Sequence, residues 1–319
     1  MPIKTLLINA LILLLFPAMA TAFQGYVQIV PGGGSIAWGD GELSVNMPLA
    51  LPGETAEVVN PALAVRKAAT SARKHLLDMV HEVRIDSRRT VSSYLAEDAQ
   101  LASRVRGVIQ NSPFSRPGMF DEEGEVTVSE RLRDKLAELV LPTTIPFQSG
   151  IPPRLASAME QSPFSQNSAP QEAGAGAAGY TGVIIDARGL GVTPALTPVV
   201  FGQDGVGAYG AFLVSRASAI RHGVAAYADT ADAEALVERV GGRPLSVRAL
   251  SAYGPWRTDV VVSAPMARLV RGVMERGQAA ELCRLVIVVD PPVVEEESMG
   301  EEGIEPEAAA TDAPTTMEQ

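Results

Sequence analysis

Residues 60–83, NPALAVRKAATSARKHLLDMVHEV, decide the first half of the fold. Their apolar side chains recur every three or four positions, which predicts a helix with one buried stripe. Asn60 is a favourable N-cap, and Pro61 suits the first helical turn, where its missing N–H costs nothing. Several members of the stripe are alanines, so we expect a sheet to approach the helix closely. Four basic side chains occupy the outer face of this helix: Arg66, Lys67, Arg73 and Lys74.

The segments around this helix predict strands and a second helix. Before it, SIAWGDGELSV (35–45) predicts a hairpin that turns at Asp40–Gly41, because glycine tolerates the positive φ of a type I′ turn. The residues after it predict, in chain order, a strand with a charged face over 83–91, a helix over 93–110, and a strand pair over 115–120 and 125–132. Residues 133–141 fit either a strand continuation or a short helix.

Composition divides the chain after residue 22 into four parts. Residues 23–141 are expected to form an α+β domain, with helices on a mixed or antiparallel sheet. Residues 142–179 are rich in Pro, Ser, Gly and Ala, which predicts a flexible linker. Residues 180–290 predict a second α+β domain that contains a hairpin with Asp204–Gly205 at its tip. Residues 291–319 are acidic and lack an apolar period, so we expect a disordered tail.

The first residues, MPIKTLLINALILLLFPAMATAFQG, predict a secretory signal peptide over 1–22. Lys4 precedes a short apolar run, Pro17 ends it, and small residues precede a cleavage site between Ala22 and Phe23. No cysteine stands at that site, so a lipid anchor is not expected there. The chain is therefore expected to be exported to the periplasm, with at most a peripheral association with the outer membrane.

Composition argues against several classes of function. The net charge is −11, but nine acidic residues and no basic ones follow Asp290, so the rest of the chain is close to neutral. A nucleic-acid-binding protein would need a basic field, and none is expected here. The single cysteine, Cys283, cannot form an internal disulfide or a structural zinc site and is expected to be buried.

No catalytic motif stands out. The sequence contains neither HExxH nor GxSxG, and the Gly189-x-Gly191 pair is followed by prolines rather than by the helix of a dinucleotide site. We therefore expect no enzyme activity, no metal site and no cofactor. A ligand cleft in the second domain remains an alternative, built from Asp186, Arg188, Tyr209, Tyr253 and Trp256. The competing interpretation is an exposed Asp186–Arg188 ion pair with aromatic residues packed in the core.

Four motifs together resemble a known envelope family: SIAWGDGELSV, NPALAVRKAATSARKHLLDMVHEVRIDSRRTV, LASRVRGVI and GEVTVSERL. Over residues 25–140 the chain resembles the family typified by a twenty-kilodalton Lpp-type lipoprotein, which includes FlgP and is similar to the N-terminal domain of FlgT. The segment from YTGVIIDARG to CRLVIVVD looks like a domain that follows it in Gram-negative envelope proteins.

The resemblance implies a structural or assembly role in a flagellar or outer-membrane ring. The expected partners are envelope proteins, or further copies of this chain in a homo-oligomer. We expect them to bind the basic face of the helix; the alternative is that these charges are only solvated and bind no partner. No catalytic residue comes with the resemblance. A periplasmic small-ligand-binding protein is the alternative function.

Overall fold

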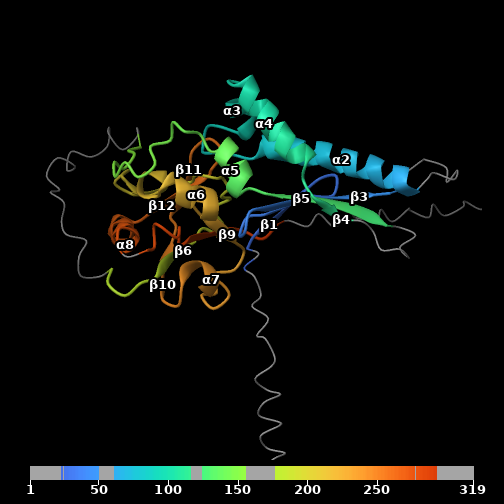
Figure 1. The fold of residues 1–319 in the computed structure, drawn as a ribbon. Helices are drawn as coiled ribbons and strands as arrows, with labels where there is room; N and C mark the ends of the chain where they lie inside the picture. Colours follow the sequence, from blue (N-terminus) through green and yellow to red (C-terminus); the bar gives the residue numbers. More distant parts are fainter. Residues whose placement is uncertain are drawn as a thin grey trace, which may run out of the picture.

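The computed structural model describes residues 23, 25–49, 61–115, 124–155, 177–276 and 278–292 (Figure 1). The predicted signal peptide, the Asn60 cap, residues 116–120 of the predicted strand and the predicted tail after residue 292 lie outside these ranges. So do residues 156–176 of the predicted linker. The fold is α+β, with helices packed on antiparallel and mixed sheets in two regions.

The first region contains a five-stranded sheet in which every pair of neighbours is antiparallel. Its order is β1 (Val27–Val30), β2 (Gly34–Ala37), β3 (Glu42–Pro48), β5 (Glu125–Arg131) and β4 (Phe114–Ser115). The predicted hairpin is β2–β3, but it does not turn through a two-residue type I′ turn. Ala37 lies opposite Glu42, so the loop has four residues, and Asp40 does not have the positive φ that a type I′ turn requires. Gly41 in this loop has φ +80°.

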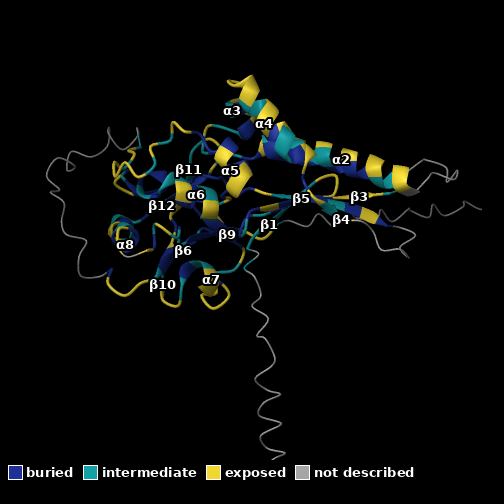
Figure 2. Ribbon diagram, viewed as in Figure 1, coloured by how far each residue is buried: buried dark blue, intermediate teal, exposed yellow. Residues whose placement is uncertain are grey.

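The predicted helix is α2 (Pro61–Glu82), which lies across β3 and β5. Its buried stripe contains Ala68, Ala72, Leu76 and Val80. The strands beneath it bury alternate residues in the same core, such as Val45 of β3. Figure 2 shows the exposed residues of α2 on the side away from the sheet. The prediction of a helix with one buried stripe on a sheet is therefore confirmed.

Two further local predictions for the first region change, and one choice that the sequence left open is settled. Residues 83–91 are not a strand, because 85–88 form a tight bend between the bridged residues Arg84 and Thr90. The helix predicted over 93–110 is interrupted, since Asp98 caps a new start. It consists of α3 (Val91–Leu95) and α4 (Ala99–Gln110). Residues 134–140 form the short helix α5 (Asp134–Val140) rather than a strand.

The second region contains two four-stranded sheets and three short helices. One sheet is parallel throughout, in the order β10 (Pro244–Arg248), β6 (Gly182–Asp186), β13 (Leu285–Val288), β9 (Ala226–Ala228). The other is mixed, in the order β11 (Ser251–Tyr253), β12 (Asp259–Val262), β7 (Val200–Gly202), β8 (Gly207–Tyr209). The helices are α6 (Arg216–His222), α7 (Val237–Val240) and α8 (Ala264–Met274), with the 3₁₀ turn η2 (Ala211–Leu213) before α6.

The two regions share one continuous core. The Tyr26 N–H donates to the Tyr227 carbonyl at 2.8 Å, and the Trp38 and Tyr227 rings meet edge to face with centroids 5.6 Å apart. Cys283 is fully buried, as expected for a lone thiol.

The first part of the predicted linker is not a spacer. Within residues 142–155, the Gly150 N–H donates to Phe212 and the Gly207 N–H donates to Pro153, at 2.9 and 2.8 Å. Phe147 in the same segment packs against the core. These contacts hold the segment along the β7–β8 hairpin, because its backbone groups find partners there.

Candidate functional site

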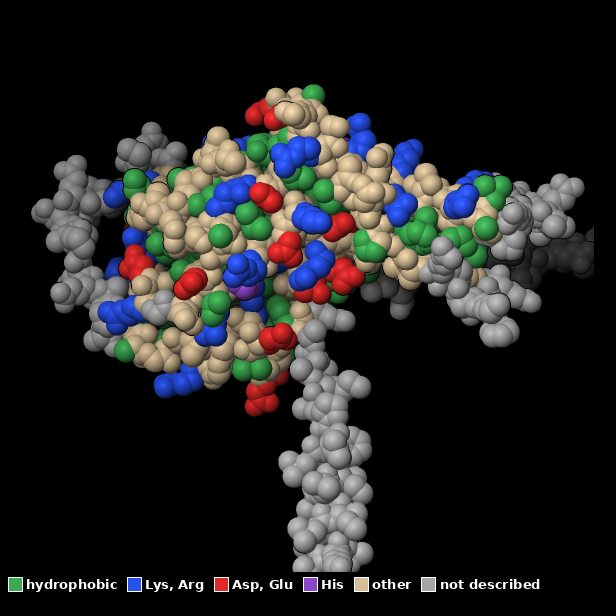
Figure 3. All heavy atoms as spheres, viewed as in Figure 1, with side chains coloured by type: hydrophobic (Ala, Val, Ile, Leu, Met, Phe, Trp, Pro, Cys, Tyr) green, Lys and Arg blue, Asp and Glu red, His purple; other side chains and the backbone are tan. Residues whose placement is uncertain are grey.

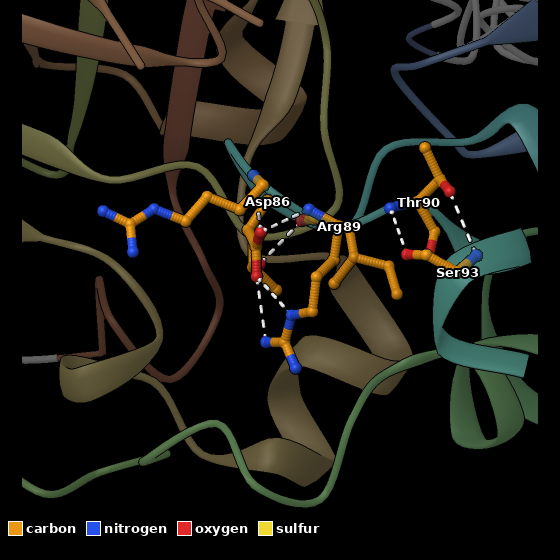
Figure 4. Close-up of polar contacts among 7 residues, drawn as sticks. Asp86, Arg89, Thr90 and Ser93 are labelled. Atoms are coloured by element: carbon orange, nitrogen blue, oxygen red, sulfur yellow. Dashed lines mark hydrogen bonds and ion pairs between the residues drawn. The ribbon is translucent and has the colours of Figure 1, made fainter. Parts of the chain in front are cut away.

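The tight bend after α2 joins the two regions. The Asp86 carboxylate accepts the backbone N–H groups of Arg88 and Arg89 at 2.9 Å and also binds the Arg89 guanidinium (Figure 4). A capping box between Thr90 and Ser93 then begins α3. Asp86 and Arg89 therefore serve local geometry rather than forming part of a charged strand face.

The bend presents backbone carbonyls to the second region. The Leu196 N–H donates to the Arg84 carbonyl at 2.9 Å, and Thr197 donates both its N–H and its hydroxyl to the Ile85 carbonyl, at 2.8 and 2.7 Å. Both Ile85 and Thr197 are buried. These three hydrogen bonds are thus shielded from water and hold the bend firmly against the second region.

A cavity of about 380 Å³ lies beside this bend. Both regions contribute to it, and its lining combines apolar side chains with the polar or charged side chains of Gln28, Glu82, Arg84 and Thr90. It is lined by Gln28, Val30, Ile36, Trp38, Met79, Glu82, Val83, Arg84, Thr90, Pro194 and Trp256. This size and lining fit a small-molecule site.

Two tryptophans from different regions set the chemistry of the cavity. The Trp38 indole N–H donates to the Gln28 side-chain oxygen at 3.0 Å, which fixes the ring. The Arg84 guanidinium lies 5.8 Å from the centre of the Trp256 ring. No carboxylate of the described ranges is within ion-pair distance of Arg84. The cavity therefore offers flat aromatic surface and a cation, Arg84, that forms no ion pair with the Glu82 carboxylate of the same lining. This combination suits a planar ligand that carries a negative group for Arg84.

Of the five residues predicted to line a cleft, only Trp256 lines this cavity. Asp186 binds Arg188 and Arg248 at 2.9 and 2.8 Å at the carboxyl ends of β6 and β10. The hydrogen bond from Arg188 is the main reason that the pKa of Asp186 is lowered to about 2. Tyr209 is fully buried and donates its hydroxyl to the Val224 carbonyl at 2.6 Å. Burial raises its pKa well above the ordinary value.

Tyr253 lies on β11, where its ring meets Phe201 edge to face at 5.9 Å. The sequence-predicted cleft therefore does not assemble, and the alternative of an ion pair with packed aromatic rings describes most of these residues. Trp38 and Arg84 are the cavity residues that sequence reasoning missed. The one signal for Trp38 was the rarity of tryptophan, since the chain has only two.

A buried carboxylate stands close to the bend. Asp259, at the start of β12, is 5% exposed and accepts the Val199 N–H at 3.0 Å. Burial raises its pKa to about 6, although hydrogen bonds from Val199 and Ser87 act in the opposite direction. Ser87 belongs to the bend of the first region, so this titratable group sits where the two regions meet.

The basic face of α2 is a separate surface. Arg66, Lys67 and Lys74 are exposed. Arg73 is not part of this exposed face, because its guanidinium donates to the Ser112 carbonyl at 2.8 Å and lies 5.3 Å from the centre of the Phe114 ring. Figure 3 shows Lys and Arg side chains along the part of the molecule that α2 occupies.

The described residues contain no group of three or more His, Cys, Asp or Glu side chains placed to hold a metal ion. None of their helices is long and apolar enough to cross a membrane.

One family model matches part of the chain. Residues 182–291 match the second domain of Treponema pallidum Tp0624. The match begins at the first residue of β6 and ends just after β13, so it spans the parallel and mixed sheets of the second region. A search of curated proteins found no match to the chain.

Proposed function

We propose that this protein is an exported, non-enzymatic component of the bacterial cell envelope that assembles with other envelope proteins through α2. The predicted signal peptide and the resemblance of residues 25–140 to the FlgP-like family support the location. The match of the second region to a domain of a Treponema pallidum protein is compatible with a bacterial source. The observation that carries the proposal is the exposed basic face of α2.

This face has the charge and position of a docking surface. The segment from 61 to 77 carries the exposed Arg66, Lys67 and Lys74 and no acidic residue. In Figure 1, α2 extends away from the second region, so a partner can approach its outer side. A basic surface favours an acidic partner and accelerates its association. The partner is an acidic envelope protein. A further copy of this chain also has a suitable charge, because the acidic residues after its Asp290 are complementary to the basic face of α2.

Crosslinking in the native envelope tests this role. We expect Arg66→Glu with Lys74→Glu to abolish the crosslinked complexes that the wild-type chain forms, because the charge of the face reverses. The matched control is Arg104→Glu with Arg106→Glu, which reverses the same number of exposed charges on α4. We expect the control to keep the complexes, and deletion of the protein to impair motility or envelope integrity.

Two results would contradict the assembly role. One is a lone monomer after mild crosslinking, combined with normal motility and an intact envelope in the deletion strain. The other is equal behaviour of the α2 and α4 variants, which would mean that the α2 charges are only solvated.

The cavity favours a second candidate function, the binding of a small periplasmic ligand. Arg84 and Trp256 supply its unpaired cation and an aromatic surface. We expect a thermal-shift screen of planar anionic metabolites to give at least one ligand that raises the Tm of the wild type. Arg84→Ala should lose this shift, whereas Arg88→Ala, on the exposed side of the same bend, should keep it. A flat screen would end this candidate.

A further inference from the structure

Phe23, the first residue after the predicted cleavage site, touches the second region. Its backbone nitrogen lies 3.0 Å from a carboxylate oxygen of Glu238, on α7. The two residues are 215 positions apart in the chain. No Lys or Arg of the described ranges is within ion-pair distance of Glu238.

Two further contacts hold this end of the chain in place. The Phe23 side chain packs against a small apolar cluster on the parallel sheet, which includes Leu236, Val240 and Val288. Gly25 has φ +70°, and a Cβ there would lie 2.4 Å from the Tyr227 carbonyl oxygen, so only glycine fits this approach. The path from Phe23 into β1 is therefore set by the second region.

Phe23 and Glu238 both line a cavity of about 270 Å³ that carries charges of both signs. Its lining contains Asp40, His222, Glu238, Arg239 and Arg284. Arg239 is already engaged, because it donates to the carbonyls of His222 and Gly223 at 2.8 and 3.1 Å. Glu238 thus accepts a hydrogen bond from the Phe23 nitrogen and forms no ion pair with a basic side chain of the described ranges. Cleavage of the predicted signal peptide would turn this nitrogen into a cation.

We propose that Glu238 is a binding site for the free α-ammonium group of Phe23, which fastens the N-terminus of the mature chain to the second region. The inference rests on the proposed export. A signal peptidase hydrolyses the Ala22–Phe23 peptide bond with water. Ala22 leaves as a carboxylate, and the released Phe23 amine takes up a proton at neutral pH. A bond between an uncharged N–H and a carboxylate thereby becomes an ion pair between an ammonium group and that carboxylate, in which both partners are charged.

The test combines N-terminal processing with a change of charge. The exported protein is first purified from the periplasm and its N-terminus determined, with Phe23 expected. The mature chain is then compared with a chain that carries Gly-Ser before Phe23, each as wild type, as Glu238→Gln and as Glu234→Gln. Glu234 is the matched control, since it is exposed and lies four residues earlier.

In the mature chain, we expect Glu238→Gln to lower the Tm by about 1–3 °C and Glu234→Gln to leave it unchanged. In the extended chain, Glu238→Gln should have a smaller effect than in the mature chain, because the ammonium group has moved away and only the Phe23 amide N–H remains to donate to residue 238. We also expect the Phe23 amine of Glu238→Gln to react with an acylating reagent at neutral pH about twofold faster or more, since less of it is held as ammonium.

Two results would overturn the proposal, and they differ in meaning. A mature N-terminus other than Phe23 would refute the predicted processing. A Phe23 terminus combined with equal behaviour of Glu238→Gln and Glu234→Gln would refute the ion pair and leave export and the assembly role intact.

Discussion

At the residue scale, Asp259 links stability to pH. Its pKa is raised from 3.8 to about 6 in the folded protein by burial, so the folded state holds a proton that the unfolded state has released between those values. Stability therefore falls as the pH rises from 3.8 to about 6, and the full penalty is present above that range. The penalty is of the order of 2–3 kcal/mol.

Asp259→Asn is expected to remove most of this penalty, because the amide keeps an oxygen that accepts the Val199 N–H. The free energy of unfolding from urea titrations should rise relative to wild type at pH 7.5 and approach the wild-type value at pH 4. A variant that is less stable than wild type at both pH values would show that the ionised form is needed.

The buried Arg133 gives a second prediction at this scale. Its guanidinium lies between Gly41 of the first region and Gly223 at the end of α6, and burial together with the neighbouring Arg239 lowers its pKa to about 10. A Cβ on Gly223 would lie 2.6 Å from the Arg133 guanidinium carbon, and φ there is +71°.

Gly223→Ala is therefore expected to lower the free energy of unfolding by about 1–3 kcal/mol. Gly242→Ala is the control, because a Cβ there meets nothing within 4 Å. Chemical denaturation compares the two. Equal stabilities would mean that Arg133 moves aside without cost.

At the element scale, the bend between α2 and α3 depends on Asp86. Asp86→Ala removes the acceptor of two backbone N–H groups and the Arg89 partner, so the loss of stability is expected to be about 1–2 kcal/mol. Asp86→Asn keeps an acceptor oxygen for the backbone and should lose less. Urea titrations measure both. If Asn and Ala cost the same, charge rather than the backbone bonds holds the bend.

At the scale of the whole molecule, the continuous core predicts that the two regions unfold together. The chain contains two tryptophans, Trp38 in the first region and Trp256 in the second. Trp38→Phe and Trp256→Phe each leave one fluorescent reporter. We expect each variant to give one urea transition, with its fluorescence midpoint coincident with its circular dichroism midpoint. A fluorescence midpoint that departs from the circular dichroism midpoint would mean that the regions unfold independently.

Elements with a local signal could be predicted from the amino-acid sequence. The α2 helix, the β2–β3 hairpin and the β7–β8 hairpin follow from periodicity and turn residues, because neighbouring residues set helical and hairpin geometry. The burial of Cys283 followed from its apolar neighbours Leu282 and Leu285.

The contacts between distant segments depend on tertiary packing and could not be predicted from the sequence. The RIDSRR stretch has the alternation of a strand, but the Asp86 bonds and the docking of Leu196 and Thr197 make it a bend. The Trp38–Trp256 cavity joins residues more than two hundred positions apart, and Arg133 finds its place between two glycines of different regions. Such contacts carry no local pattern, because packing across the chain, rather than the spacing of neighbours, selects them.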